Sequence, residues 1–238
     1  MSIQLTGTLT AADAKRHIEH PFTVPDGVTA LAIHFRHQAN AENGLVNMLT
    51  LTVFDPVDCR GAGHRGGQGL DGGLLAHDVV INRATATPGY RPGPIQPGQW
   101  RVVIDTHRIT NIAPADYWLD IELSDAVVDE GVVQPPSPSQ IPLQASEVSK
   151  NPRWYRGDLH AHTVHSDGSW DLPDLLTAAR QFQLDFITLT DHNTVSPLAQ
   201  MDAATTPALL TMGGLELTTF YGHALALGLR HWVDSRVN

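Results

Sequence analysis

The chain has 238 residues, 42% of them apolar and 17% charged, which is enough for a buried core in one large or two small domains. Its 25 acidic residues outnumber 15 basic ones, and the net charge of -10 argues against binding to a nucleic-acid backbone. Cys59 is the only cysteine, which excludes an intrachain disulfide and a cysteine-rich zinc site. The sequence contains neither an apolar run of about 18 residues nor an N-terminal export pattern, so we expect no membrane span and a cytoplasmic protein.

From residue 26 to about residue 125, apolar and polar side chains alternate with the period of two that is typical of half-buried strands. Turn-forming residues separate these strands at Asp26-Gly27, in the glycine-rich stretch 61–73 and in 87–94. The pattern therefore predicts an antiparallel β-sandwich over residues 1–130. Four segments carry it: Leu31–Phe35, Leu49–Val53, Trp100–Ile104 and Tyr117–Leu123.

Residues 131–152 contain five prolines and no apolar periodicity, which predicts a Pro/Ser-rich linker. After it, residues 153–238 alternate between apolar strands and a helix, the order typical of a parallel α/β unit. The helix is expected to begin near Asp171, with Asp171 as its N-cap and Pro173 in the first turn. Four strands are expected around it: Tyr155–Leu159, Asp185–Thr190, Ala208–Met212 and His223–Leu227.

Side chains of metal-ligand type gather where these strands end. His160 and His162 lie two residues apart on an extended segment, so both can point to one metal ion. Imidazoles and carboxylates without thiolates suit zinc, manganese or iron. Asp158 and Asp191 are predicted to orient a ligand imidazole. The predicted metal ligands are His160, His162, Asp167, His192, Glu216 and His223.

Other readings of the polar residues are weaker. Ser166 and Ser169 lie near histidines but lack the strand–turn–helix context of a nucleophilic serine, which leaves a serine hydrolase as a weak alternative. Ordinary polar side chains are expected at His34, His37, His64, His77, His107 and His231, and His165 is expected on a loop surface.

Three segments resemble the first three motifs of the PHP (polymerase and histidinol phosphatase) superfamily. They are Asp158–Gly168 (DLHAHTVHSDG), Phe186–Asn193 (FITLTDHN) and Gly214–Leu217 (GLEL), within a resemblance that covers 154 to about 229. Segments 54–56, 86–90, 93–95 and 98–102 are similar to the β-domain that precedes the PHP domain in carbaryl-hydrolase-like metallohydrolases of the CehA/McbA type.

The resemblance implies a distorted (β/α)7 barrel that holds two or three divalent metal ions and uses a metal-bound hydroxide as the nucleophile. In that scheme His160 and His162 bind one ion, and Glu216 bridges it to a second ion held by His223. The third site is served by Asp167 and His192.

The later motifs of the family, a further histidine and an Asp-x-His pair, are missing, because only His231 follows His223. Four predicted strands cannot close a seven-stranded barrel, so we expect an incomplete barrel that lacks its C-terminal part. An incomplete barrel would expose an apolar sheet edge, and a homodimer is one expected outcome.

The leading functional hypothesis is a metal-dependent hydrolase that cleaves a phosphoester in a small-molecule substrate. A carboxylic or carbamic ester hydrolase on the same metal centre is the alternative that the carbaryl-hydrolase resemblance favours. A third hypothesis is a non-catalytic binding module whose PHP half is a remnant.

Overall fold

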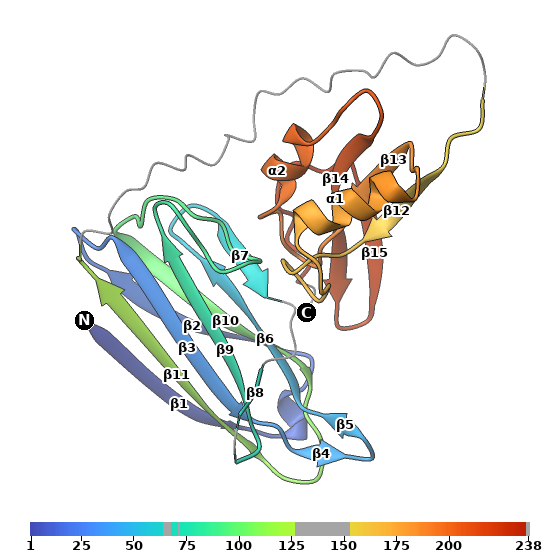
Figure 1. The fold of residues 1–238 in the computed structure, drawn as a ribbon. Coiled ribbons are helices and arrows are strands. Elements are labelled where there is room, and N and C mark those ends of the chain that lie inside the picture. Colours follow the sequence, from blue (N-terminus) through green and yellow to red (C-terminus); the bar gives the residue numbers. More distant parts are fainter. Residues whose placement is uncertain (64–67, 71, 127–152, 237–238) are drawn as a thin grey trace. The chain divides into compact units, whose positions relative to one another are not determined.

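The computed structural model describes residues 1–63, 68–70, 72–126 and 153–236 (Figure 1). The chain divides into two compact units, residues 1–133 and 134–237. The linker predicted at 131–152 lies outside the described residues. Within the described ranges, no helix has the length and apolar character needed to cross a membrane.

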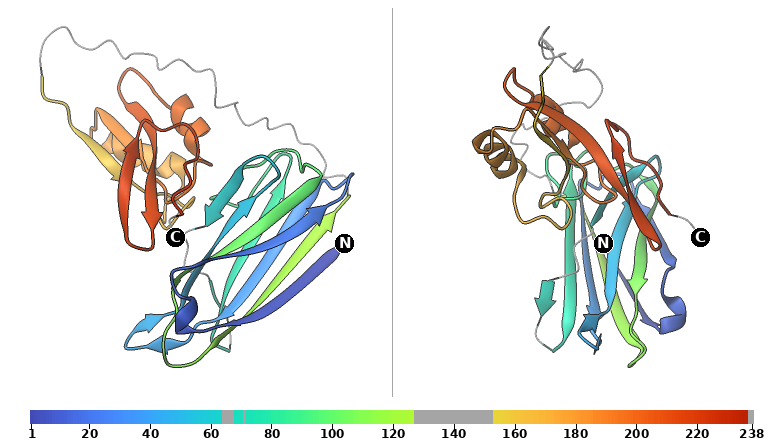
Figure 2. Two further views of the ribbon diagram at one scale, coloured as in Figure 1. Left: turned by 180° about the vertical axis from the view of Figure 1, so that it is seen from behind. Right: turned by 90° about the vertical axis from the view of Figure 1, so that its right-hand side faces the viewer.

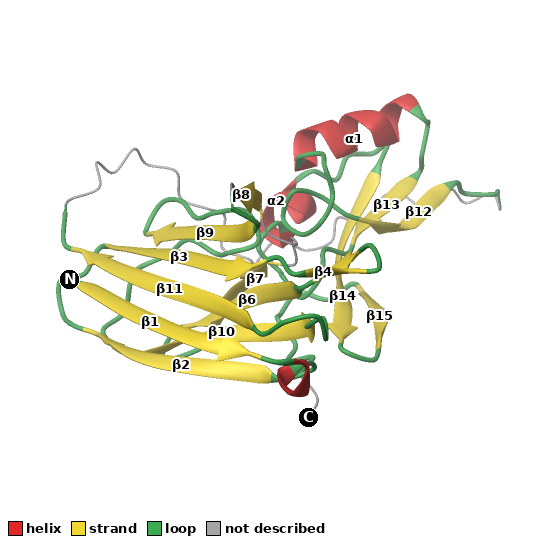
Figure 3. Cartoon of the chain, turned by 90° about the horizontal axis from the view of Figure 1, so that it is seen from below, coloured by secondary structure: helices red, strands yellow, loops and turns green. Residues whose placement is uncertain are grey.

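The first unit consists of two antiparallel sheets, which confirms the β-sandwich (Figures 2 and 3). The first sheet has the order β1 (Ser2–Leu9), β11 (Ala115–Ser124), β3 (Ala30–Gln38), β9 (Leu74–Asn82) and β8 (Gln68–Leu70). The second has the order β2 (His17–Val24), β10 (Gly98–Arg108), β6 (Met48–Phe54) and β7 (Cys59–Gly63). A 3-10 turn (Ala11–Asp13) follows β1, and a hairpin of β4 (Ala41–Glu42) and β5 (Leu45–Val46) precedes β6.

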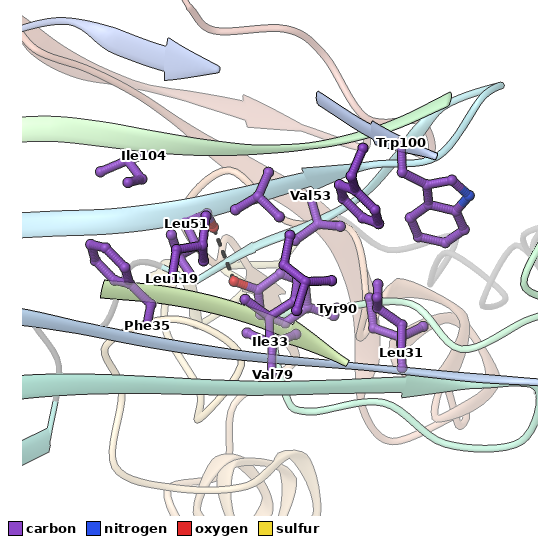
Figure 4. Close-up of a cluster of buried hydrophobic side chains, with 14 of the residues drawn as sticks. Leu31, Ile33, Phe35, Leu51, Val53, Val79, Tyr90, Trp100, Ile104 and Leu119 are labelled. Carbon is purple, nitrogen blue, oxygen red and sulfur yellow. Dashed lines mark hydrogen bonds between the residues drawn. The ribbon is translucent and has the colours of Figure 1, made fainter. Parts of the chain in front are cut away.

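The alternating apolar positions of the predicted strands form the core between the two sheets (Figure 4). Tyr90, from the loop 87–94, enters this core and donates a hydrogen bond from its hydroxyl to the Leu51 carbonyl at 3.0 Å. The predicted core residues are buried in β3 (Leu31, Ile33, Phe35), β6 (Leu49, Leu51, Val53), β10 (Trp100, Val102, Ile104) and β11 (Tyr117, Leu119, Ile121, Leu123).

Two features of this unit differ from the sequence prediction. Strands β1, β2 and β9 have no counterpart among the four predicted segments, and β7 and β8 run through the glycine-rich stretch that was predicted to separate strands. β1 lies at a sheet edge, and Ile3, Leu5 and Leu9 alternate there with polar residues, a pattern that the prediction overlooked. Gly61 lies within β7, and only glycine fits at this position, because a Cβ there would lie 2.2 Å from the Gly89 carbonyl oxygen.

The second unit contains one sheet with the order β12 (Gly157–Ala161), β13 (Phe186–Leu189), β14 (Leu210–Thr219) and β15 (Gly222–Leu227). The first three strands are parallel, as predicted. Helix α1 (Leu172–Gln181) begins after Asp171, whose side chain accepts a hydrogen bond from the Asp174 backbone N–H, so the predicted N-cap is confirmed. Its buried face packs with β13 in a second core, which also includes Met201 of α2 (Leu198–Ala203).

The last predicted strand is present, but its direction and burial differ from the prediction. β15 is antiparallel to β14 and mostly exposed, instead of buried in a parallel sheet. Only Phe220 and Tyr221 separate the two strands, and such a short connection cannot make the crossover that a parallel pair requires. Leu225 and Leu227 are exposed on this edge strand. The described part of the second unit is therefore an open four-stranded sheet, not a barrel.

Candidate metal centre

The register of the parallel strands brings two of the predicted ligands side by side. Leu189, the last residue of β13, pairs with Gly213 of β14. His192 and Glu216 each lie three residues further along, and an isolated parallel bridge pairs them. Both side chains therefore lie past the point where β13 ends, which is where α/β folds commonly place their sites.

Three ligand atoms form a close triangle. His160 Nε2 lies 2.8 Å from Glu216 Oε2, His162 Nε2 lies 3.0 Å from the same oxygen, and the two Nε2 atoms are 2.9 Å apart. Each Nε2 carries at most one proton, so protons on the imidazoles cannot turn all three edges into hydrogen bonds. A cation between these atoms would satisfy all three, since imidazole and carboxylate lone pairs are metal ligands.

The other predicted ligands extend this triangle into two further groups. Asp167 lies 3.7 Å from His162 Nδ1 and 3.6 Å from His192 Nε2. These distances are too long for hydrogen bonds and close to the separation of about 3.4 Å expected for two ligand atoms about 2.1 Å from one ion. His223 Nδ1 lies 2.7 Å from the second oxygen of Glu216, Oε1. The structure thus gathers all six predicted ligands into three overlapping groups.

Buried side chains form the base of the centre and exposed ones its rim. The side chains of Glu216 and His192 are each 6% exposed, whereas those of Asp167, His160 and His223 are 52%, 48% and 44% exposed. The centre is therefore open to solvent on the side of the exposed ligands.

The protonation states at the base suit metal binding. Burial acts to raise the pKa of Glu216, but the hydrogen bond from His160 and the neighbouring imidazoles outweigh it, and the pKa is lowered overall. Burial lowers the pKa of His192. Glu216 is thus a carboxylate and His192 neutral near neutral pH, and these are the forms in which both residues bind metals.

Asp191 holds the loop that follows β12. Its buried carboxylate accepts hydrogen bonds from the Thr163 N–H at 2.8 Å, the Thr163 hydroxyl at 2.7 Å and the Ser166 hydroxyl at 2.6 Å. Ser166 Oγ lies 3.3 Å from His162 Nδ1, so Asp191 reaches a ligand imidazole through Ser166. Asp158 accepts a hydrogen bond from the His160 backbone N–H at 3.0 Å. Orientation of an imidazole by either carboxylate stays a prediction.

Sequence reasoning missed the hydroxyl groups that contact the ligands. Thr218 Oγ1 lies 2.5 Å from His192 Nδ1 and donates to the Glu216 carbonyl at 3.2 Å. Asn193, with a φ of 50°, exchanges two hydrogen bonds with the Thr218 backbone and fixes the loop after β13 against β14. The sequence spacing could have identified Thr218 as a residue of the site, because it lies two residues after Glu216 and so on the same face of the strand.

Comparisons with known proteins give no close relative. No family model and no curated protein matches the chain. The solved structure of PliG, a periplasmic inhibitor of g-type lysozyme from Salmonella Typhimurium, is 11% identical over 52% of this chain and 87% of its own, with a TM-score of 0.24. A structure of infectious bursal disease virus, Gt strain, is 15% identical over 50% of this chain and 31% of its own, with a TM-score of 0.20. Likenesses this weak carry no argument about fold or function.

Proposed function

We propose that the chain is a metal-dependent hydrolase of PHP type that acts on a phosphoester in a small molecule. The observation that supports this most directly is the triangle of His160, His162 and Glu216, whose three lone-pair atoms lie within 3.0 Å of one another. In this proposal the open sheet of the second unit is the first part of an incomplete (β/α)7 barrel.

The residues present fit divalent cations such as zinc, manganese or iron. The groups contain imidazoles and carboxylates, and Glu216 directs one oxygen to His160 and His162 and the other to His223. Divalent cations held there would lower the pKa of water and neutralise the charge that develops on the ester oxygens.

The side chains themselves perform two further tasks. Glu216 brings a negative charge to the base of the site, and this charge draws cations to a position otherwise shielded from water. The exposed rim of Asp167, His160 and His223 leaves one side open to an incoming ester group. The preference for phosphoesters rests on the resemblance to the PHP superfamily, and the resemblance of the sandwich segments favours carboxylic or carbamic esters as the second candidate.

Three model substrates separate these candidates: p-nitrophenyl phosphate, bis(p-nitrophenyl) phosphate and p-nitrophenyl acetate, each with Mn(II) or Zn(II). We expect the wild type to hydrolyse a phosphoester, Glu216→Gln to lose at least about 100-fold in rate, and His231→Ala, an exposed histidine outside the groups, to keep its activity. Hydrolysis of the acetate alone would contradict the phosphoesterase and favour the second candidate. A wild type without turnover on any ester would favour a non-catalytic binding module.

A further inference from the structure

We infer that two hydroxyl groups, those of Ser166 and Thr218, fix the tautomers of His162 and His192 so that each imidazole offers Nε2 to a metal ion. This inference rests on the metal centre of the proposed function. Its consequence is that the three groups of ligands are not equivalent, and that the group of His160, His162 and Glu216 binds the first ion.

The argument for His162 begins at Asp191. Asp191 is 1% exposed, and its Oδ1 atom lies 2.6 Å from Ser166 Oγ, a distance typical of a hydroxyl that donates to a carboxylate. A serine hydroxyl has one proton, so Ser166 Oγ can only accept from the imidazole nitrogen on its other side, His162 Nδ1 at 3.3 Å. His162 therefore carries its proton on Nδ1, and its lone pair lies on Nε2.

The argument for His192 begins at the Glu216 backbone. The Glu216 carbonyl can only accept, so Thr218 Oγ1, 3.2 Å away, is the donor in that contact. The same oxygen then accepts from His192 Nδ1 at 2.5 Å. The lone pair of His192 is thus on Nε2, which is 3.6 Å from Asp167.

A neutral imidazole has one lone pair, so these tautomers make the three groups inequivalent. In the first group, the lone pair on His162 Nε2 faces His160 and Glu216. In the second group, Asp167 lies 3.7 Å from His162 Nδ1, which carries the proton. In the third group, Glu216 Oε2 lies 3.6 Å from His192 Nδ1, which also carries its proton. We therefore expect the first ion to bind in the group of His160, His162 and Glu216.

The tautomers can be read directly by long-range proton–nitrogen NMR on the full-length, metal-free protein at pH 8, with imidazole signals assigned from His→Gln variants. We expect His162 and His192 in the wild type to be protonated on Nδ1. Protonation of either residue on Nε2 would overturn the inference. The wild-type spectrum alone decides this outcome, so it does not depend on whether a variant folds.

Matched variants test the hydroxyls themselves. Thr218→Val should move the proton of His192 to Nε2 in part of the molecules, whereas Thr218→Ser, which keeps the hydroxyl, should not. Ser166→Ala should do the same to His162 and weaken Zn(II) binding about 10- to 100-fold in a chelator competition. Thr190→Val is the control, because it removes a buried hydroxyl that bonds to the Ala161 carbonyl rather than to an imidazole. Unchanged tautomers in both Thr218→Val and Ser166→Ala would contradict the inference.

A titration with Zn(II) tests the order of binding. The first equivalent should shift the Nε2 signals of His160 and His162, and a first equivalent that shifts only His192 and His223 would overturn this order. If the tautomers are as expected but no zinc binds, the proposed metal-dependent function fails while the role of the two hydroxyls stands.

Discussion

Glu216 is the residue on which the candidate metal centre converges. A carboxylate on a side chain that is 6% exposed is costly to bury unless charge and hydrogen bonds compensate for lost hydration. Three imidazoles lie within 3.0 Å of its two oxygens, from His160, His162 and His223. A cation would satisfy the ligand atoms that protons on the imidazoles leave unsatisfied, and the buried charge therefore supports the proposed binding site.

A second group of histidines lies in the β-sandwich and has a different character. The rings of His37 and His77 stack with centroids 5.9 Å apart and planes inclined by 22°. Their Nε2 atoms are buried and, within the described residues, have no hydrogen-bond partner. Burial, with the nearby His37 and Arg36, lowers the pKa of His77 from 6.5 to about 4, and burial also lowers the pKa of His37. Both side chains are therefore neutral in the folded protein at neutral pH.

We expect the sandwich to lose stability in mild acid. Between pH 6.5 and pH 4 the unfolded chain protonates His77 while the folded chain does not, so the free energy of unfolding falls as the pH falls. At pH 5 the loss from His77 alone is about 2 kcal/mol. Urea unfolding at pH 7.5 and 5.0 should show this loss in the wild type and less of it in His77→Phe.

The control for this experiment is His34→Gln, since His34 lies on β3 with a partly exposed side chain that contacts Asp78. It should keep the wild-type dependence on pH. An equal loss between the two pH values in the wild type and in His77→Phe would show that His77 is not the group responsible.

The elements show why some features were predictable and others were not. His160 and His162 were found because the period of a strand alone places residues two apart on one face. The bridge between His192 and Glu216 depends on the register of β13 and β14, which the separate strand sequences do not specify. The apolar residues Leu225 and Leu227 would suit either a buried parallel strand or an exposed hairpin strand. The sequence pattern therefore could not distinguish these two arrangements of β15.

The loop between β12 and α1 is held by a close backbone contact at Gly168. A Cβ added there would lie 2.5 Å from the His162 carbonyl oxygen and 2.7 Å from the Thr163 nitrogen, and backbone atoms cannot move aside without shifting the loop. We expect Gly168→Ala to destabilise the second unit by about 1–3 kcal/mol and to weaken Zn(II) binding, because the loop carries His162 and Asp167. Chelator competition and thermal unfolding measure the two effects.

Gly69→Ala is the comparison for this variant, because a Cβ at Gly69 has no atom within 4 Å. It should bind zinc like the wild type. Wild-type zinc affinity in a folded Gly168→Ala protein would mean that the position of the loop does not matter for the site.

At the scale of the molecule, His37 and His77 lie in one unit and the proposed metal ligands in the other. The sandwich core and the core beneath α1 are separate clusters, and each described strand pairs within its own unit. The sandwich was predictable because half-buried antiparallel strands alternate over many residues. The three parallel strands were predictable from short apolar runs on either side of a capped helix.

This separation predicts that zinc stabilises one unit and leaves the other unchanged. A ligand at 100 times its dissociation constant stabilises the state that binds it by about 2.7 kcal/mol. Scanning calorimetry with and without Zn(II) should show one transition that moves to higher temperature and one that stays. The transition whose temperature does not change with zinc should be the one that moves to lower temperature at pH 5. Movement of the acid-sensitive transition on addition of zinc would contradict this assignment.

The central claim, that His160, His162 and Glu216 hold a divalent ion, is tested most directly by the metal content of the purified full-length protein, measured by plasma mass spectrometry. We predict at least one divalent ion per chain in the wild type and in His231→Ala, and a loss of that ion in Glu216→Gln. A wild type without bound metal, or a Glu216→Gln variant with the same metal content as the wild type, would contradict the account.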